Sequence, residues 1–238
     1  MSTKPRLWAA IPAAGAGKRM ASPIPKQYLE LLGHKVIDHT IHALLDHPDI
    51  CGVTIATSAD DEWWPHTRYA NHAQVRRVNG GKERIWSVLN ILADLAVTAR
   101  PDDWVLVHDA ARPCLHRTDL DALISACKKH PVGGLLGMPV RDTMKRTSHQ
   151  QVIENTVPRE NLWHAFTPQM FRLEPLLQAI KSAVTADALI TDEAGAMEQA
   201  GKHPLMIEGH PGNIKITRPG DLALAEFFLQ QNIAKQET

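Results

Sequence analysis

Four stretches of this chain are apolar at nearly every position, and they constrain the fold more than any other feature. They are residues 7–12 (LWAAIP), 51–58 (CGVTIATS), 104–107 (WVLV) and 132–140 (VGGLLGMPV). A strand with one face in water alternates apolar and polar residues, whereas these stretches do not alternate. Strands of this kind are buried on both faces, as in a parallel sheet covered by helices on either side.

Segments with helical spacing separate these strands. In residues 82–97, apolar residues recur at 85, 88, 89, 92 and 95, which is the spacing of a helix. Further helices are expected at 26–34, 36–48, 119–130, near 174–184, near 192–200 and from Pro219 onward, with a short strand at 73–81 and a strand pair near 205–217. The predicted fold class is therefore α/β: a Rossmann-like, mainly parallel sheet with helices on both faces, in a single domain of residues 1–238.

Residues 141–163 break this alternation. The segment RDTMKRTSHQQVIENTVPRENLW is polar and has no helical period, and its two halves look like short strands joined around residues 148–150. Such a segment has little apolar surface to bury by itself. The sequence therefore predicts either a mobile hairpin or a projecting β-arm that docks on another subunit.

Charge and cysteine content exclude several classes of function. The 26 Lys and Arg residues balance 26 Asp and Glu residues, so no overall charge attracts the chain to nucleic acid or to an acidic membrane. No apolar run approaches the length of a membrane span, and residues 7–14 are too short for the core of a signal peptide. Cys51, Cys114 and Cys127 are widely spaced without a C-x-x-C pair, which favours a reducing cytoplasm over a disulfide framework.

A glycine-rich loop follows the first predicted strand, at the edge where open parallel sheets bind ligands. Its sequence, PAAGAGKRM (12–20), fails the Walker pattern G-x-x-x-x-G-K-[ST]. It also lacks the third glycine of the dinucleotide fingerprint, because Met20 holds that position, and no acidic residue ends the second strand. Together with Pro25 and Lys26, it does match the nucleotidyltransferase loop G-x-G-x-R-M followed by P-K.

The residue types of this loop suit a nucleoside triphosphate. Gly15 and Gly17 let backbone amide groups approach phosphate oxygens. Attack at the α-phosphorus adds charge to its oxygens and expels pyrophosphate, so cations are needed on the transferred and on the leaving phosphates. Arg19 can clamp two oxygens with its guanidinium, and Lys26 offers a movable point charge. The alternative is a tight turn that carries solvated cations.

Asp109 ends the apolar strand 104–107, in the sequence VHDAARP. The carboxyl ends of parallel strands share one edge of the sheet, so this carboxylate is expected beside the glycine loop. An acidic residue next to a triphosphate can help to hold a divalent cation. Arg112 can bind a substrate phosphate or brace Asp109. The alternative is an ion pair that caps a strand.

Two further segments carry polar groups that fit a nucleotide. In GGKERIWSVL, Gly80 and Gly81 precede a predicted helix, and helix N-termini attract anions. Arg84 and Ser87 share one face of that helix, where Ser87 can bond to a ribose or a base edge. In GHPGNIKIT, Lys215 lies in a predicted short strand, where an isolated lysine more often protects a sheet edge.

Taken in order along the chain, these motifs resemble the 2-C-methyl-D-erythritol 4-phosphate cytidylyltransferase family over about residues 7–226. The motifs are P-A-A-G-x-G-x-R-M, P-K-Q-Y, G-G-x-x-R-x-x-S-V, V-H-D-A-A-R-P, D-T, P-R, T-P-Q-x-F, T-D-[DE]-A and G-x-x-x-N-I-K-[IV]-T. The chain departs from the commonest family pattern at Glu193, where aspartate is also frequent, and at Gly195, where serine is common.

The resemblance implies a nucleotidyltransferase fold and a reaction. CMP would pass from CTP to 2-C-methyl-D-erythritol 4-phosphate, with release of pyrophosphate and a requirement for Mg²⁺. By resemblance, Arg19 and Lys26 stabilise the transition state, while Arg159 and Lys215 position the attacking phosphate. The CTP positions are Pro12, Ala13, Ala14, Gly15, Gly17, Arg19, Lys26, Gly81, Arg84 and Ser87. The acceptor positions are Asp109, Arg112, Thr143, Arg159, Thr167 and Lys215, with Asp109 near the metal, directly or indirectly.

The family also gives the arm at 141–163 a role. It is similar to a hairpin through which two subunits embrace as a homodimer, so that Arg159 would reach the neighbouring active site, with Thr167 as a second candidate. A cytidylyltransferase for another polyol phosphate, such as ribitol 5-phosphate, is the nearest rival function. A nucleotide-binding protein without activity and an NAD-dependent oxidoreductase are more distant ones. The first of these is disfavoured by the presence of Arg19, Lys26, Asp109 and Lys215. The second is disfavoured by Met20 and by the end of the second strand, which has no acidic residue.

Overall fold

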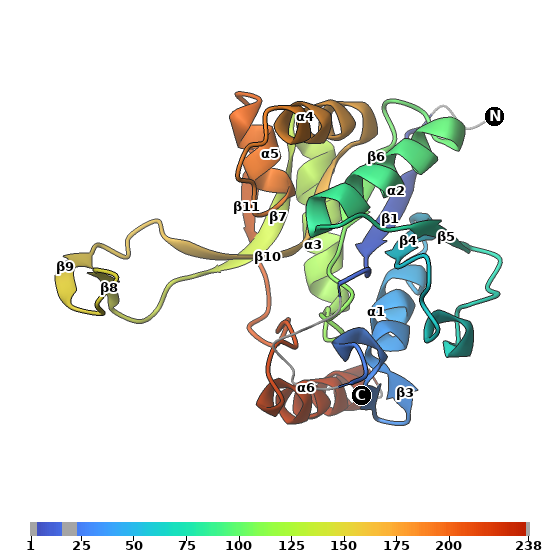
Figure 1. The fold of residues 1–238 in the computed structure, drawn as a ribbon, viewed down its shortest axis with the longest axis horizontal. Coiled ribbons are helices and arrows are strands. Elements are labelled where there is room, and N and C mark those ends of the chain that lie inside the picture. The colour runs from blue at the N-terminus through green and yellow to red at the C-terminus, as the bar shows by residue number, and fades with distance from the viewer. Residues whose placement is uncertain (1–3, 16–22, 237–238) are drawn as a thin grey trace.

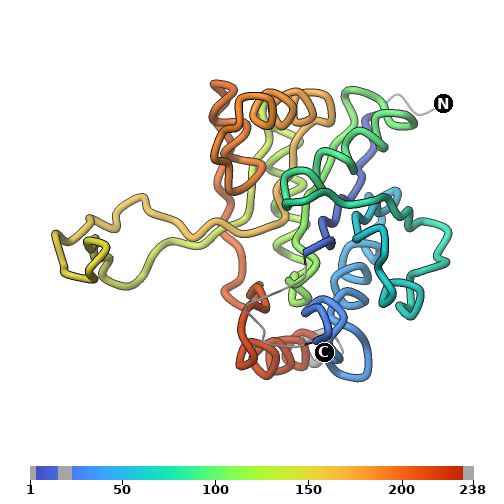
Figure 2. Tube along the Cα trace, in the orientation of Figure 1, coloured from blue at the N-terminus to red at the C-terminus, as the bar shows by residue number. Residues whose placement is uncertain are grey.

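A central sheet of seven strands organises the protein, whose computed structural model describes residues 4–15 and 23–236 (Figures 1 and 2). The strand order is β11-β7-β10-β6-β1-β4-β5. The strands are β1 (Leu7–Pro12), β4 (Ile50–Thr57), β5 (Val75–Asn79), β6 (Trp104–Val107), β7 (Gly133–Pro139), β10 (Trp163–Arg172) and β11 (Leu205–Glu208). Only β10 runs antiparallel to its two neighbours, so the mainly parallel sheet expected from the sequence is confirmed.

Helices cover both faces of the sheet, as predicted. They are α1 (Val36–Leu45), α2 (Arg84–Thr98), α3 (Arg117–Lys129), α4 (Leu173–Thr185), α5 (Glu193–Gln199) and α6 (Gly220–Gln236), with 3-10 turns η2 (Lys26–Tyr28) and η3 (Trp64–His66). Within the described residues, none of these helices is both long enough and apolar enough to cross a lipid bilayer.

The lack of alternation in the strand sequences has a direct structural cause. In β6, the side chains of Trp104 and Leu106 belong to the core that α1 and α3 close. The intervening Val105 and Val107 belong to a second core, on the opposite face, that α2, α4 and α5 close. Both faces of the strand are therefore sealed from water, and an apolar residue is favoured at every position.

Residues 26–34 do not form the predicted helix. After η2, the chain makes a small hairpin of β2 (Glu30–Leu31) and β3 (His34–Lys35). Leu32 and Gly33 connect these strands with φ values of 51° and 76°, which is left-handed backbone that a helix cannot contain. The prediction of a strand around Lys215 is also wrong, because β11 is the last strand of the described chain.

The segment 141–163 extends away from the body of the protein (Figures 1 and 2). It contains β8 (Met144–Thr147) and β9 (Ile153–Val157), which pair with each other and with no strand of the central sheet. Val152 and Ile153, at its outer end, are 62% and 61% exposed. These two side chains expose apolar surface in a segment that is otherwise mostly polar.

Candidate active site

The loops after β1 and β6 meet at one edge of the sheet because these strands are parallel neighbours. The backbone N–H of Ala13 donates to Ala56 at 2.7 Å, which fixes the start of the first loop against β4. The amide of Gln27 donates to the carbonyl oxygens of Ala13 at 2.8 Å and of Gly15 at 3.2 Å. Gln27 is 4% exposed, so a buried side chain fixes the backbone of this loop.

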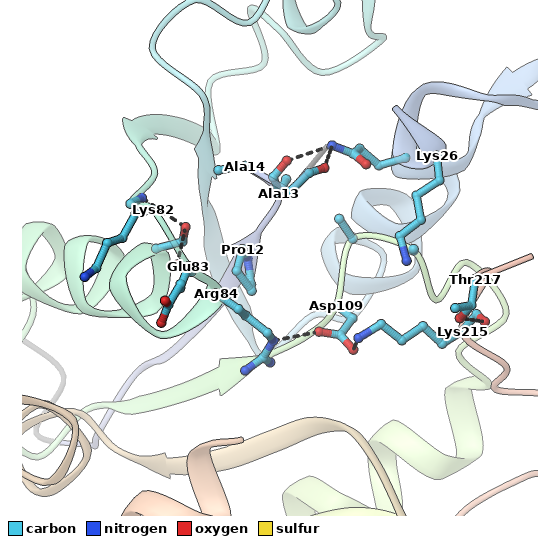
Figure 3. A pocket seen from close by; sticks show the side chains of 16 residues that line it. Pro12, Ala13, Ala14, Lys26, Lys82, Glu83, Arg84, Asp109, Lys215 and Thr217 are labelled. Atoms are coloured by element: carbon cyan, nitrogen blue, oxygen red, sulfur yellow. Dashed lines mark hydrogen bonds and ion pairs between the residues drawn. The ribbon is translucent and has the colours of Figure 1, made fainter. Parts of the chain in front are cut away.

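Lys26 projects into the same space from η2 (Figure 3). Its Nζ donates to the backbone oxygen of Ile216 at 2.8 Å, next to Lys215. Two predicted cations thus come from opposite ends of the chain to one wall of the pocket. Gly17 and Arg19, the other predicted members of the glycine loop, lie outside the described residues.

The Gly80–Gly81 segment forms the opposite wall. The N–H of Gly80 donates to Thr57 at 2.7 Å, and a Cβ added to Gly80 would lie 2.3 Å from the Cβ of Ala14. A side chain here would separate the two loops, so glycine is required for their close approach. The N–H of Gly81 donates to the Ser87 hydroxyl at 3.1 Å, and Ser87 therefore shapes this loop from the start of α2.

Arg84 links this wall to the centre of the site. Its Nε donates to Asp109 at 3.0 Å, and its two terminal nitrogens donate to the Glu193 carboxylate at 2.6 and 3.1 Å. Burial alone would lower the pKa of Arg84, but Glu193 and Asp109 outweigh it and hold that pKa above its usual value. The guanidinium is therefore a fixed cation with a fixed orientation.

Asp109 is the anion around which the cations gather (Figure 3). Its second oxygen lies 2.8 Å from Lys215 Nζ and 3.5 Å from Arg112 Nε. Burial would raise the pKa of Asp109, but Arg84, Lys215 and Arg112 hold it well below the usual value, so the carboxylate stays ionised. Burial lowers the pKa of Arg112, against the effect of Asp109.

Together these walls enclose a cavity of about 370 Å³. Of the predicted site residues, the lining includes Pro12, Ala13, Ala14, Gly15, Lys26, Gly81, Arg84, Ser87, Asp109 and Lys215. Arg112 and Thr167 lie next to Asp109, at 9% and 4% exposure, and do not line the cavity. Thr167, the second candidate for a residue that reaches the neighbouring active site, instead accepts the backbone N–H of Asp109 in its own chain at 3.0 Å. Thr143 and Arg159 belong to the projecting arm, where Arg159 donates to the backbone oxygen of Arg141.

Two residues with clear structural roles at this site were missed from the sequence. Gln27 supports the glycine loop, and Glu193 orients Arg84 from α5. Both residues belong to motifs quoted above, P-K-Q-Y and T-D-E-A, and that membership was the only sequence signal for them. A motif does not say which group each side chain contacts, because these contacts join distant parts of the chain.

The polar groups of the cavity fit a magnesium nucleotide better than a metal ion held by protein alone. Within the described residues, no group of three or more His, Cys, Asp or Glu side chains could hold a metal. Asp109 and Glu83 are the carboxylate residues among those that line the cavity. Mg²⁺ is commonly held by one or two carboxylates together with substrate phosphates, which is the arrangement that this donor set allows.

Comparisons with known proteins identify the family to which this sequence is similar. The family model for 2-C-methyl-D-erythritol 4-phosphate cytidylyltransferase (IspD) matches residues 7–231. The protein of that name from Vibrio vulnificus strain CMCP6 is 51% identical over 225 residues, covering 94% of this chain and 95% of the relative. The one from Pseudomonas putida strain GB-1 is 49% identical over 223 residues, covering 93% and 95%.

Solved structures give the same result for the fold. The crystal structure of the Francisella tularensis protein of this name superposes with a TM-score of 0.82 at 34% identity, covering 94% of this chain and 99% of the other. The crystal structure of the Thermus thermophilus protein of this name gives a TM-score of 0.76 at 27% identity, covering 94% and 99%.

Proposed function

This chain belongs to the 2-C-methyl-D-erythritol 4-phosphate cytidylyltransferase family, and from that premise we propose that the cavity beside β1 and β6 is where it carries out the family reaction. The reaction transfers CMP from CTP to 2-C-methyl-D-erythritol 4-phosphate, giving 4-diphosphocytidyl-2-C-methyl-D-erythritol and pyrophosphate in isoprenoid precursor biosynthesis. The observation that carries the proposal is the convergence of Lys26, Arg84 and Lys215 on one cavity around Asp109.

The arrangement suits a reaction between two anions. The attacking group is a phosphate that is already ionised near neutral pH, so no strong general base is needed. The cavity instead provides cations that reduce the repulsion between the acceptor phosphate and the triphosphate and align them for in-line attack. In this proposal Lys26, with Arg19, stabilises charge on the transferred and leaving phosphates, and Lys215 holds the attacking phosphate.

The nucleotide occupies the side of the cavity formed by the glycine loop. Backbone groups of Pro12–Gly15, with Gly17, bind the triphosphate, and Gly81, Arg84 and Ser87 bind the remainder of CTP. The close packing of Gly80 against Ala14 keeps the two loops that would bind CTP next to each other. Arg112 and Thr167 contribute to the acceptor side of the site, where both contact Asp109.

Mg²⁺ is the proposed cofactor, held mainly by the CTP phosphates with Asp109 as the protein carboxylate. When bound, the ion neutralises charge on the triphosphate oxygens. Asp109 at the same time keeps Lys215 and Arg84 in place. We further propose the cytoplasm as the compartment, supported by three unpaired cysteines, and small molecules rather than nucleic acid as substrates.

The substrate assignment is tested by measuring pyrophosphate release from combinations of nucleotide and acceptor. We expect CTP with 2-C-methyl-D-erythritol 4-phosphate to react about 100-fold faster or more than CTP with ribitol 5-phosphate, because the unpaired polar groups of a mismatched acceptor are costly. UTP and ATP serve as nucleotide controls. A faster reaction with ribitol 5-phosphate would replace the proposed acceptor while keeping the cytidylyltransferase chemistry.

We propose that the arm at 141–163 completes the active site of a second subunit in a homodimer, through Arg159 and Thr143. The support is geometric: both residues lie on a hairpin that leaves the body and carries exposed Val152 and Ile153. A polar segment with a few aliphatic side chains suits an intersubunit contact better than a core.

Mixing two inactive variants tests this shared site. In a heterodimer of Lys26→Ala and Arg159→Ala subunits, one of the two sites would combine an intact Lys26 with an intact Arg159. We expect about half of the wild-type activity per verified heterodimer, since a two-fold dimer has two equivalent sites. If Arg159 acts within its own subunit, both sites carry a defect, and activity stays at the level of the separate variants.

A further inference from the structure

Lys82 is a cation at the active-site cavity to which the family motifs assign no role. The motif G-G-x-x-R-x-x-S-V, which covers residues 80–88, leaves positions 82 and 86 open, and this chain has lysine and tryptophan there. Lys82 nevertheless lines the cavity, across from Lys26 (Figure 3). A lysine in that place is a candidate ligand for an anionic nucleotide.

The main chain next to Lys82 is fixed, while its side chain is exposed. The N–H of Gly81 donates to the Ser87 hydroxyl at 3.1 Å, and a Cβ added to Gly81 would overlap with the Cβ of Trp86. The residue before Lys82 is therefore packed against the start of α2. The side chain of Lys82 itself lies in solvent. Its flexible four-carbon stem can carry the ammonium to different positions at the edge of the cavity.

The ammonium of Lys82 rests on an aromatic ring, one helical turn further along the chain. Its Nζ lies 5.5 Å from the ring centroid of Trp86, within the range of a cation–π contact. The other described cations that line the cavity are Lys26, Arg84 and Lys215, and each of them is held by a protein oxygen. An exposed cation–π contact is weak, so Lys82 gives up less than these cations when it turns to an oxygen of a ligand.

Glu83 gives this edge of the cavity a need for a cation. It also lines the cavity, and its side chain is exposed next to Lys82. The carboxylate of Glu83 has the same sign of charge as the triphosphate of CTP, so the two repel each other. Lys82 offsets that charge, and an edge without the lysine would be net negative toward an anionic ligand.

We propose that Lys82 is a further CTP-binding residue of this chain: its ammonium leaves the ring of Trp86 and binds an oxygen of the nucleotide. The inference rests on the proposed function, because it assigns Lys82 to the nucleotide wall of that cavity. Lys82 increases the affinity for CTP without aligning the two reacting phosphates. An interaction made equally with the bound substrate and with the transition state lowers KM and leaves kcat unchanged.

The test compares variants that remove the charge of Lys82 with variants that keep it. Lys82→Met removes the charge at similar length, and Lys82→Arg keeps a cation. Lys129→Met is the matched control, because Lys129 is exposed at the end of α3, does not line the cavity, and leaves the same net charge when it is replaced. Steady-state pyrophosphate release and calorimetric titration with magnesium and CTP are measured at about 0.05 M and about 0.5 M monovalent salt.

We expect Lys82→Met to raise the KM and the Kd for CTP about three- to tenfold at the lower salt concentration, as for the loss of one exposed charge contact. Its kcat and its KM for the acceptor should stay within about twofold of wild type, because Lys82 lies on the nucleotide wall. The higher salt concentration should reduce the effect on CTP to less than about twofold, since salt screens exposed charges. Lys82→Arg and Lys129→Met should both stay within about twofold of wild type.

Several results would overturn the inference. They are an unchanged affinity for CTP in Lys82→Met, an equal loss in Lys129→Met, an effect that salt does not reduce, and a loss of kcat at unchanged affinity. If thermal unfolding shows that Lys82→Met is destabilised, Lys82→Gln replaces it under the same criteria. Failure of the proposed function is distinguishable: wild type would then release no pyrophosphate from CTP with any acceptor, while the calorimetric titrations would still compare the variants for nucleotide binding.

Discussion

A Lys26→Ala variant should fold normally and lose about 10²- to 10³-fold in kcat, the usual effect of removing one donor that stabilises transition-state charge. Lys26 reaches the cavity from η2, where its ammonium donates to the backbone carbonyl of Ile216, the residue after Lys215. Its removal would take away one of the two cations, with Arg19, that we propose for the transferred and leaving phosphates. The measurement is steady-state pyrophosphate release, with folding checked by circular dichroism and thermal unfolding.

Lys35→Ala is the matched control for this variant. Lys35 also donates to a backbone carbonyl, that of His66 at 2.6 Å, but it does not line the cavity. Its kcat should remain within about twofold of wild type, as for a surface change away from the reacting groups. A loss below about threefold in Lys26→Ala would remove Lys26 from the catalytic set.

Asp109→Asn should reduce both activity and stability, because it leaves Arg84, Arg112 and Lys215 without their shared anion. We expect kcat to fall by about 10²-fold or more, since Lys215 and Arg84 lose their alignment. The free energy of unfolding at neutral pH should fall by about 3 kcal/mol, the low end for breaking a buried pair, because Arg84 and Lys215 are partly exposed. Urea unfolding and the pyrophosphate assay measure the two effects.

The stability loss in Asp109→Asn should depend on pH in a defined direction. The folded-state pKa of Asp109 is depressed, so its charge contributes stability above the pKa of an unfolded aspartate, about 3.9, and loses that contribution as the pH falls through the lower folded-state value. The difference between wild type and variant should therefore be full at neutral pH and shrink below about pH 4. Asp49→Asn, in an exposed ion pair with Lys128, should cost less than about 1 kcal/mol. Equal losses at Asp109 and Asp49 would contradict the central role of Asp109.

The strands that were best predicted from the sequence are those with both faces buried. Residues 7–12 and 104–107 have a helical layer on each side, so burial alone determines their composition, and the observed β1 and β6 span those residues. The positions of Asp109 and the glycine loop followed from the same reasoning, because the carboxyl ends of parallel neighbours share an edge.

Two local errors have identifiable causes. Residues 26–34 contain helix-favouring residues, but Leu32 adopts a positive φ that leucine seldom takes, and the turn is stabilised by the surrounding fold. Strand β10 was not predicted either, and it contains Pro168, a residue that is unusual within a central strand. The structure accommodates this proline where the pairing with β7 shifts register between Ala165 and Gln169.

Only part of the candidate site could be predicted from the sequence, again because tertiary packing decides the rest. Motifs identify residue types beside a reacting group, and these placed Lys26, Asp109 and Lys215 correctly in one cavity. Gln27 holds the carbonyl of Ala13 and Glu193 holds the guanidinium of Arg84, and each contact joins parts of the chain that are separated in sequence. Such contacts depend on tertiary packing, which no short pattern encodes.

The ion pairs around the cavity also bear on the energetics of substrate binding. Arg84 and Lys215 rest on Asp109, and Lys26 rests on the carbonyl of Ile216, so the mutual repulsion of these cations is already offset during folding. A phosphate that binds there would meet cations whose charge is already partly neutralised by protein oxygens. The measured affinity for substrate will consequently report only the gain over those existing contacts, and it will understate the strength of each individual phosphate contact.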